Sequence, residues 1–335
     1  MNSSVTRYLA DSFSHIYVEE KAYDYPLTRD LLNRFGNSKI IRINHYKDLF
    51  NRSKQDFVLQ KKSQSLILAV NTTDLIYLGA RFCQSFGNEH FYYTSNIMNC
   101  IYDCEYCYLQ GMYPSGNLVI FVNIEDYFNK VKEMLKEHPM YICISYDTDL
   151  LALENLTHIT QKWIDFTCKN PNLTIEVRTK SMFDVTTLNN SNHPDVIFAW
   201  TLSPDEITEY EHYTPSLDNR IKAIQKAVLH GCKVRLCFDP MIYTADYKTI
   251  YARCYKKVFD NISAKDIFDI SIGTFRISSD YLKSMRRKRN CAITAYPYEN
   301  INGICSYDTK KSGEMINFAE SELSQYITKD KIYEI

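Results

Sequence analysis

The sequence has no run of about 18 consecutive apolar residues, the length that a membrane-spanning helix needs. Its first residues, Met-Asn-Ser-Ser-Val-Thr-Arg, lack the apolar core of a secretory signal peptide. Internal repeats and low-complexity tracts are also missing, which argues against a repeat architecture. We therefore expect a cytoplasmic protein with no membrane partner.

An excess of charge of either sign is missing too. Lys and Arg total 39, Asp and Glu total 40, and the net charge is −1. A protein without a basic field can bind nucleic acid only through a local patch of cations. The 11 cysteines do not have the regular spacing of a disulfide framework, which suits a reducing cytosol where thiols stay free.

Three cysteines lie close together in the segment Cys100-Ile-Tyr-Asp-Cys104-Glu-Tyr-Cys107-Tyr108. The spacing CxxxCxxC allows one loop to hold an iron–sulfur cube, because cysteine sulfur is the usual ligand of such clusters. A four-iron cluster held by three cysteines leaves one iron without a protein ligand, and a substrate or cofactor can bind there. Cys100, Cys104 and Cys107 are therefore the predicted ligands of a [4Fe–4S] cluster.

Other uses of three cysteines fit the sequence less well. A zinc site needs a fourth ligand nearby, but no second CxxC follows and the nearest histidine, His90, lies ten residues before Cys100. Three closely spaced cysteines cannot all pair with one another in disulfides. An iron–sulfur protein without catalytic activity, for redox sensing or electron transfer, remains an alternative at this point.

The segment CIYDCEYCYLQGMYPSGNLVIFVNIEDY resembles the cluster loop of the spore photoproduct lyase family of radical S-adenosylmethionine (SAM) enzymes. The likeness includes VEEKAYDYPLTRDLLNRF upstream and EVRTKS and WTLS downstream, and it fades after about residue 275. The resemblance implies that the open iron binds SAM. One electron, from a donor such as flavodoxin or ferredoxin, then cleaves SAM to a 5′-deoxyadenosyl radical.

The same resemblance implies a substrate. In the family the radical starts the reversal of a methylene-bridged thymine dimer, 5-thyminyl-5,6-dihydrothymine, to two thymines. The implied partner is damaged double-stranded DNA, from which the lesion must be extruded before it can react. The implied activity is that of a DNA repair lyase.

The order of the segments predicts an α/β fold. From about residue 88 strand-like and helix-like segments alternate in about six units, which favours parallel strands covered by helices. Together with the resemblance, this pattern predicts a partial (β/α)6 TIM-type barrel with a small N-terminal α/β extension. We divide the chain into the extension at 1–86, the barrel at 87–290, and a C-terminal hairpin and helix at 291–335.

Catalytic groups in such barrels lie at the C-terminal ends of the strands. The resemblance implies that Thr148 and Asp149 hold SAM, that Lys180 approaches its carboxylate, that Thr201 contacts it and that Tyr106 stacks on its adenine. Ordinary alternatives exist, since Asp149 can cap a following helix and Lys180 can be a solvated loop charge.

One position departs from the family. A cysteine that returns hydrogen to the product is expected two residues before Thr148, where this chain has Tyr146. Cys143 lies on the same strand, but side chains alternate along a strand, so Cys143 and Tyr146 should face opposite sides. The candidates for this catalytic step are thus Tyr146, Cys143 and Tyr108, with Tyr106 beside them, and Cys143 has a buried core position as its ordinary alternative.

The family also presents a basic and aromatic hairpin beside the lesion. The comparable segment here, AYPYENINGICSYD, has Tyr296 and Tyr298 for stacking but no arginine. Arg276, at a strand end, is a further candidate for a phosphate or substrate contact. Cations gather just before the hairpin and could either contact phosphates or complement a helix C-terminus. These cations are Lys283, Arg286, Arg287, Lys288 and Arg289.

The missing cysteine and the missing arginine leave a second function open. A radical SAM enzyme of the same fold could act on a peptide or a small molecule instead of DNA. Cleavage of SAM together with repair of the dimer would separate the leading function from this alternative. An absence of SAM cleavage would favour the redox protein without catalytic activity.

Overall fold

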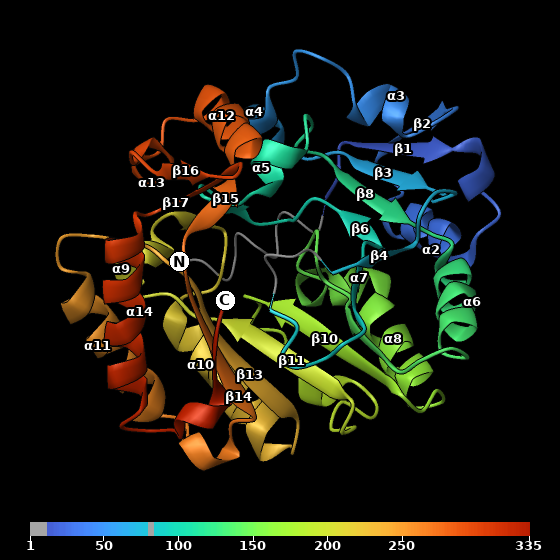
Figure 1. Cartoon of the computed structure of the whole chain (residues 1–335). Helices are drawn as coiled ribbons and strands as arrows, with labels where there is room; N and C mark the ends of the chain where they lie inside the picture. The colour runs from blue at the N-terminus through green and yellow to red at the C-terminus, as the bar shows by residue number, and fades with distance from the viewer. Residues whose placement is uncertain (1–11, 80–83) are drawn as a thin grey trace.

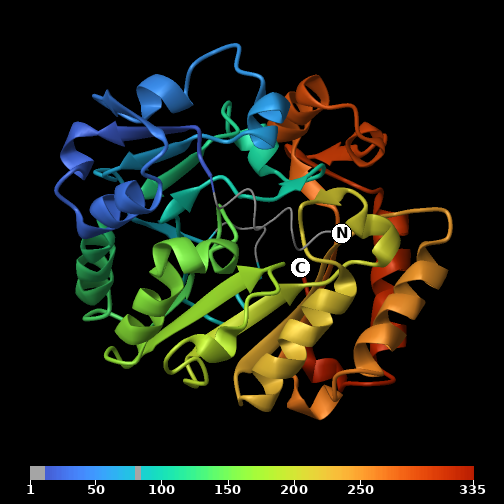
Figure 2. The same ribbon diagram turned by 180° about the vertical axis from the view of Figure 1, so that it is seen from behind.

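The computed structural model describes residues 12–79 and 84–335. The described chain forms two larger sheets, which Figure 1 shows on opposite sides of the molecule, with the N-terminal sheet in blue. Figure 2 shows the same arrangement from behind. Helices cover the outer faces of both sheets, and the loop that carries the three clustered cysteines lies between them.

The larger sheet has eight strands in the order β18-β14-β13-β11-β10-β9-β5-β4. Every neighbouring pair is parallel except β4 and β5. The central strands are buried on both faces, as expected for a parallel sheet covered by helices. Their bounds are β4 Ile76–Leu78, β5 Phe91–Thr94, β9 Met140–Cys143, β10 Leu173–Thr179, β11 Val196–Thr201, β13 Lys233–Met241, β14 Asp269–Thr274 and β18 Ile332–Glu334.

The smaller sheet has five strands in the order β2-β1-β3-β8-β6. It takes strands from both sides of the cysteine loop, because β6 precedes the loop and β8 follows it. The N-terminal sheet thus anchors the two ends of the loop in one hydrogen-bonded unit. The bounds are β1 His15–Glu19, β2 Lys39–Ile43, β3 Leu66–Ala69, β6 Ile97–Met98 and β8 Leu118–Phe121.

Amphipathic helices connect the strands. For example, α10 begins after Ser216, whose hydroxyl accepts a hydrogen bond from the Asn219 amide at 3.4 Å, and the chain turns at Gly231 with a φ of 82°. The helices of four or more residues are α2 Pro26–Arg34, α3 Lys47–Phe50, α4 Phe57–Lys62, α5 Leu109–Met112, α6 Ile124–Met134, α7 Glu154–Thr157, α8 Ile159–Thr167, α9 Asp205–Thr208, α10 Leu217–Leu229, α11 Tyr247–Phe259, α12 Ser279–Lys288, α13 Ala292–Ala295 and α14 Thr309–Leu323. Short 3-10 turns lie at η1 Glu20–Ala22, η2 Leu151–Leu153, η3 Val185–Thr187, η4 Ala264–Asp266 and η5 Lys329–Lys331.

Two small antiparallel sheets complete the fold. The strands β15 Arg276–Ser278, β16 Glu299–Ile301 and β17 Ile304–Ser306 form one, in the order β15-β17-β16. Its hairpin turns at Asn302 and Gly303, with φ angles of 52° and 87° that suit an Asn-Gly turn. The other sheet pairs β7 Asp103–Cys104 with β12 Glu211–His212, and so fixes the cysteine loop to a distant segment.

The structure confirms the mixed α/β fold. The sequence segments KIIRI, SLILAV, LTIEVRT, VIFAWTL and KVRLCFDPMI contain β2, β3, β10, β11 and β13. The sheets are open, since β4 and β18 are edges of the eight-stranded sheet. Among the described residues, no helix is both long and apolar enough to cross a membrane. The ten described cysteines are free thiols.

Candidate iron–sulfur and SAM site

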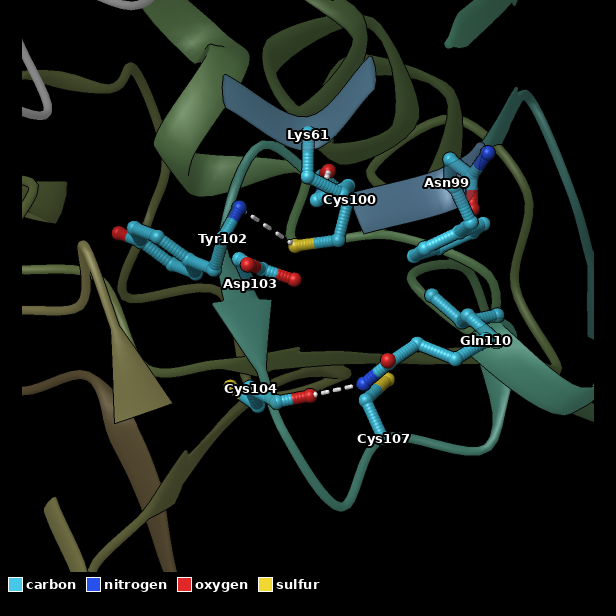
Figure 3. Close-up of a pocket in the computed structure, with 10 residues that line it drawn as sticks. Lys61, Asn99, Cys100, Tyr102, Asp103, Cys104, Cys107 and Gln110 are labelled. Carbon is cyan, nitrogen blue, oxygen red and sulfur yellow. Dashed lines mark hydrogen bonds between the residues drawn. The ribbon is translucent and has the colours of Figure 1, made fainter. Parts of the chain in front are cut away.

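Cys100, Cys104 and Cys107 line one pocket (Figure 3). Cys100 follows β6, Cys104 is the last residue of β7, and Cys107 lies between β7 and α5. The backbone amide of Tyr102 lies 3.4 Å from the sulfur of Cys100, and the side-chain amide of Gln110 donates to the carbonyl of Cys104 at 2.6 Å. The loop is thus held by its own polar groups around the three sulfurs.

The three thiols fit an iron–sulfur cluster better than a single ion. Within residues 12–79 and 84–335, no three His, Cys, Asp or Glu side chains lie close enough together to share one metal ion. A cube binds each thiolate through a different iron, so its ligands need not converge on one point. Burial raises the pKa of each of these cysteines to about 12, and bound iron would deprotonate them.

Lys180 reaches the cysteine loop from the end of β10. Its ammonium lies 3.9 Å from the sulfur of Cys104, 3.2 Å from the Tyr106 hydroxyl and 3.0 Å from a carboxylate oxygen of Glu211. Burial opposes its charge, but Cys104 and Glu211 outweigh burial and raise the pKa of Lys180 well above its ordinary value. The alternative of a solvated loop charge is therefore wrong.

Glu211 is the functional-site residue that sequence reasoning missed. It lies on β12 opposite Cys104, and it is 2% exposed. Its carboxylate pairs with Arg220 and Lys180 and accepts hydrogen bonds from Tyr106 and, at 2.9 Å, from Ser203. Burial alone would raise its pKa, but the two cations hold the pKa of Glu211 well below its usual range. No local sequence signal marks it as part of this site, because Tyr106, its partner in the cysteine loop, is 105 residues away.

Asp149 is fixed in the segment between β9 and η2. Its carboxylate accepts hydrogen bonds from the Thr179 hydroxyl at 2.8 Å and from the backbone amides of Lys180 at 2.7 Å and Ala152 at 3.1 Å. The bond from Ala152 ties Asp149 to the 3-10 turn η2 that follows, although the N-cap residue of that turn is Leu150. Asp149 also joins this segment to the end of β10.

Thr148 and Thr201 provide polar groups at the same strand ends. Thr148 is 8% exposed, and its hydroxyl has no hydrogen-bond partner among the described residues. Thr201 is the last residue of β11 and is buried, and its carbonyl accepts a hydrogen bond from Arg220 at 3.1 Å. A buried hydroxyl without a partner costs free energy, so Thr148 fits a polar ligand that is bound here.

The tyrosines around the loop separate into two groups. Tyr106 is buried, and its hydroxyl is bonded to Glu211 and to Lys180. Tyr108 points elsewhere, because its hydroxyl donates to the backbone carbonyl of Tyr146 at 2.5 Å, and the two rings lie 5.9 Å apart. The ring of Tyr146 also stacks on Tyr93 at 4.1 Å. The structure thus brings Tyr108 and Tyr146 together.

Cys143 is the last residue of β9 in the eight-stranded sheet. It is buried, it pairs in register with Glu176 on β10, and it shares its face of β9 with Tyr141. The Tyr141 hydroxyl donates to Glu176 at 2.5 Å and accepts from Arg235 at 2.7 Å. Cys143 therefore borders a buried network of charges between the strands.

The basic residues of α12 have two kinds of environment. Lys288 donates to the carbonyls of Gln110 and Tyr113 at 2.6 Å each, and Arg289 pairs with Asp103 at 2.6 Å. Burial, with Arg287 adding to it, lowers the pKa of Lys288 to about 8. These two cations therefore hold the cysteine loop.

The other members of the basic run are exposed. Arg286 donates to the carbonyls of Thr294 and Tyr296, and Lys283 lies 3.5 Å from Asp280. Arg287 is exposed on the same helix.

Arg276, the further candidate for a substrate contact, is paired with Asp239 at 3.0 Å. The hydroxyl of Tyr296 accepts from Lys311 at 2.6 Å, and its ring lies 5.0 Å from that of Tyr298.

This geometry defines a class of protein. A parallel α/β sheet carries polar groups at its strand ends beside a loop with three cysteines, which is the arrangement of a radical SAM enzyme. A family model for spore photoproduct lyase matches residues 12–302. The match extends beyond residue 275, where the likeness of the sequence motifs fades. The chain belongs to the spore photoproduct lyase family.

Curated relatives agree with the family match. Spore photoproduct lyase of Clostridium acetobutylicum is 26% identical over 287 residues, which cover 81% of each chain. Spore photoproduct lyase of Bacillus subtilis strain 168 is 21% identical over 250 residues, which cover 72% of each chain.

Solved structures of spore photoproduct lyase have the same fold. A double mutant with bound AdoMet and dinucleoside spore photoproduct has a TM-score of 0.80 at 19% identity, covering 96% of this chain and 98% of that chain. A complex with dinucleoside spore photoproduct has a TM-score of 0.79 at 18% identity, with the same coverage.

Proposed function

We propose that this protein is a radical SAM lyase that reverts the spore photoproduct, 5-thyminyl-5,6-dihydrothymine, to two thymines in damaged double-stranded DNA. The observation that carries this proposal is the pocket lined by Cys100, Cys104 and Cys107 in a chain of the spore photoproduct lyase family. A [4Fe–4S] cluster with bound SAM supplies a 5′-deoxyadenosyl radical. The curated relatives and the solved structures above support the choice of lesion.

The protein's own residues hold and orient the reactants. Cys100, Cys104 and Cys107 would hold three irons, which leaves the fourth iron for SAM. Lys180 and Thr148 are proposed to bind the polar end of SAM. Lys180 is a cation whose side chain is 16% exposed, and Thr148 has a buried hydroxyl without a partner among the described residues.

Three further residues of the SAM site are proposed in supporting roles. Asp149 would orient the Lys180 backbone through the hydrogen bond between them. Thr201, at the next strand end, and Tyr106 would complete the SAM site. The proposed stacking of Tyr106 on adenine needs only its ring, since its hydroxyl is already bonded to Glu211.

We infer that Tyr108 and Tyr146 form the hydrogen-atom relay of this protein. Their hydroxyl-to-carbonyl contact of 2.5 Å supports a joint role, and burial raises the pKa of Tyr108 well above its ordinary value, so its phenol keeps its proton. Cys143 is the alternative donor. Tyr146→Phe should raise the share of abortive thymine products, while Cys143→Ala should leave it unchanged; the reverse result would assign the donor to Cys143.

The remaining assignments follow from the proposed activity. Six neighbouring parallel strands within 87–290 support the proposed partial (β/α)6 barrel there: β5, β9, β10, β11, β13 and β14. The segments 1–86 and 291–335 are proposed as the N-terminal extension and the C-terminal hairpin and helix. The free cysteines suit a cytoplasmic location. The electron donor is proposed to be a flavodoxin or a ferredoxin.

The function is tested by anaerobic incubation of the reconstituted protein with dithionite, SAM and an oligonucleotide that contains the dimer. We expect loss of the dimer and recovery of two thymines, and we expect neither with Cys104→Ala, which removes one cluster ligand. SAM cleavage without loss of the dimer would overturn the proposed substrate and leave a radical SAM enzyme with another one. Absence of SAM cleavage from a protein that holds its cluster would overturn the enzyme class.

A further inference from the structure

The cluster pocket has a wall that does not come from the barrel. Lys61 and Phe57, both on α4 of the N-terminal part of the chain, line the pocket beside the three cysteines (Figure 3). The Lys61 ammonium donates to the backbone carbonyl of Cys100, and Gln64 donates to the same carbonyl at 3.2 Å. Lys61 is 2% exposed, which is exceptional for a lysine.

The position of Lys61 is fixed by contacts on the far side of the cysteine loop. Gln60 accepts a hydrogen bond from the Gly116 amide at 2.8 Å, and Gln64 donates to the Gly116 carbonyl at 2.7 Å. A Cβ atom at position 116 would lie 2.7 Å from the backbone carbonyl oxygen of Phe57, so only glycine permits this close approach. The helix α4 is thereby attached to both flanks of the loop.

Lys61 differs from the other cations at this site in its ion-pair partners. Arg289 is paired with Asp103, and Lys180 is paired with Glu211. Within the part of the chain that the structure describes, Lys61 forms no salt bridge; the negative groups that act on its ammonium are the three cysteines, once ionised, and Asp103, which is itself paired with Arg289. Burial lowers the pKa of Lys61, and the thiolates that would hold the cluster oppose that shift and favour its charged form.

We propose that Lys61 is a positioning residue that raises the reduction potential of the cluster, an inference that rests on the proposed function. Reduction adds one electron, and hence one negative charge, to a cluster that already has three thiolates. A buried cation at the same pocket is weakly screened and stabilises the more negative state. Net charge, hydrogen bonding and burial are the properties that set the potentials of protein-bound clusters.

This inference gives the N-terminal part of the chain a function. The donor protein has to reduce the cluster before SAM is cleaved, and a missing cation would make that step less favourable. Lys61 thus links α4 to electron uptake, although it touches neither SAM nor the lesion in this proposal.

The test compares anaerobically reconstituted Lys61→Gln, Lys61→Arg and Lys62→Gln with the wild-type protein. Gln keeps a hydrogen-bond donor but removes the charge, Arg keeps the charge, and Lys62 is an exposed lysine on the same helix. Iron content and visible absorbance report whether the cluster is present. A redox titration followed by the EPR signal of the reduced cluster reports its potential.

We expect Lys61→Gln to keep its cluster and to lower the equilibrium constant for reduction about tenfold, or about 59 mV for one electron. Lys61→Arg and Lys62→Gln should match the wild type. An unchanged potential in Lys61→Gln with the cluster present would overturn the inference alone. A wild-type protein that takes up no cluster would overturn the proposed function itself.

A second comparison covers the case in which a neutral variant fails to hold the cluster. If Lys61→Gln and Lys61→Met load no iron but Lys61→Arg does, the charge stabilises the bound cluster, which supports the electrostatic contact between Lys61 and the cluster on which the inference depends. If Lys61→Arg fails as well, the role of Lys61 is steric, and the inference is wrong.

Discussion

At the scale of single residues, Glu211 connects the site to the stability of the protein. It is a buried carboxylate between Arg220 and Lys180. We expect Glu211→Gln to lower the free energy of unfolding by about 3–5 kcal/mol, because it leaves buried cations without their counter-charge. Urea denaturation of the metal-free protein measures this change. Asp260→Asn, which removes an exposed partner of Lys256, should leave the midpoint unchanged and serves as the control.

The same carboxylate predicts a dependence of stability on pH. Because the folded state lowers the pKa of Glu211, its contribution is complete above the unfolded-state value of about 4.3 and is lost as the pH falls toward the lower folded-state value. As the pH falls below about 4.3, the wild type should therefore lose stability more steeply than Glu211→Gln. Parallel curves for the two proteins in that range would contradict the predicted shift.

At the scale of elements, the cysteine loop depends on the close approach of α5 and α12. A Cβ atom at Gly111 would lie 2.6 Å from the Cα and 2.7 Å from the carbonyl oxygen of Tyr281, and this backbone cannot move without displacing α12. Gly111→Ala should lower the free energy of unfolding by about 1–3 kcal/mol. Thermal or urea unfolding checks this value.

Gly313, in the helix α14, provides the matched control. A Cβ atom there meets nothing within 4 Å. Gly313→Ala should raise stability by about 0.5–1 kcal/mol, because alanine loses less backbone entropy than glycine when a helix forms. Equal effects of the two substitutions would mean that α5 and α12 are not in tight contact.

At the scale of the whole molecule, the charge is balanced, so contact with DNA depends on local exposed cations. Arg287 is exposed on α12, whereas its neighbour Lys288 donates to the carbonyls of Gln110 and Tyr113. We expect Arg287→Gln to weaken binding of damaged duplex and to lower the slope of log K against log salt by about 1. Fluorescence anisotropy at several salt concentrations measures the slope.

Lys288→Gln distinguishes a phosphate contact from a structural one. It should reduce the stability of the cysteine loop, seen as lower cluster occupancy, and leave the salt slope unchanged. A slope that falls for Lys288→Gln but not for Arg287→Gln would mean that the two adjacent cations have the opposite roles.

The elements and the cluster ligands could be predicted from the sequence because their signals are local. The three cysteines lie within eight residues. Strands such as β10 and helices such as α10 are indicated by the spacing of their own apolar residues. The C-terminal ends of parallel strands meet at one edge of a sheet, so the sequence pattern also places Lys180 and Asp149 near each other.

Other features needed the tertiary structure. Tyr106 and Glu211 are 105 residues apart, Lys61 and Cys100 are 39 apart, and Arg289 and Asp103 are 186 apart. No periodicity or spacing relates such pairs, and a lysine or glutamate looks the same in sequence whether it is solvated or buried. The basic run at the end of α12 illustrates this, because only tertiary contacts, of Lys288 with Gln110 and Tyr113 and of Arg289 with Asp103, separate the two cations that hold the loop from the exposed ones.

By itself, the sequence determined the mixed α/β fold and the loop of three closely spaced cysteines that we propose as cluster ligands, since both depend on residues that are near one another along the chain. Only the tertiary structure decided which charges surround those cysteines, that Tyr108 meets Tyr146, and that α4 supplies a buried lysine to the pocket. These contacts form when distant segments pack together, and burial then turns ordinary polar side chains into the electrostatic environment of the site.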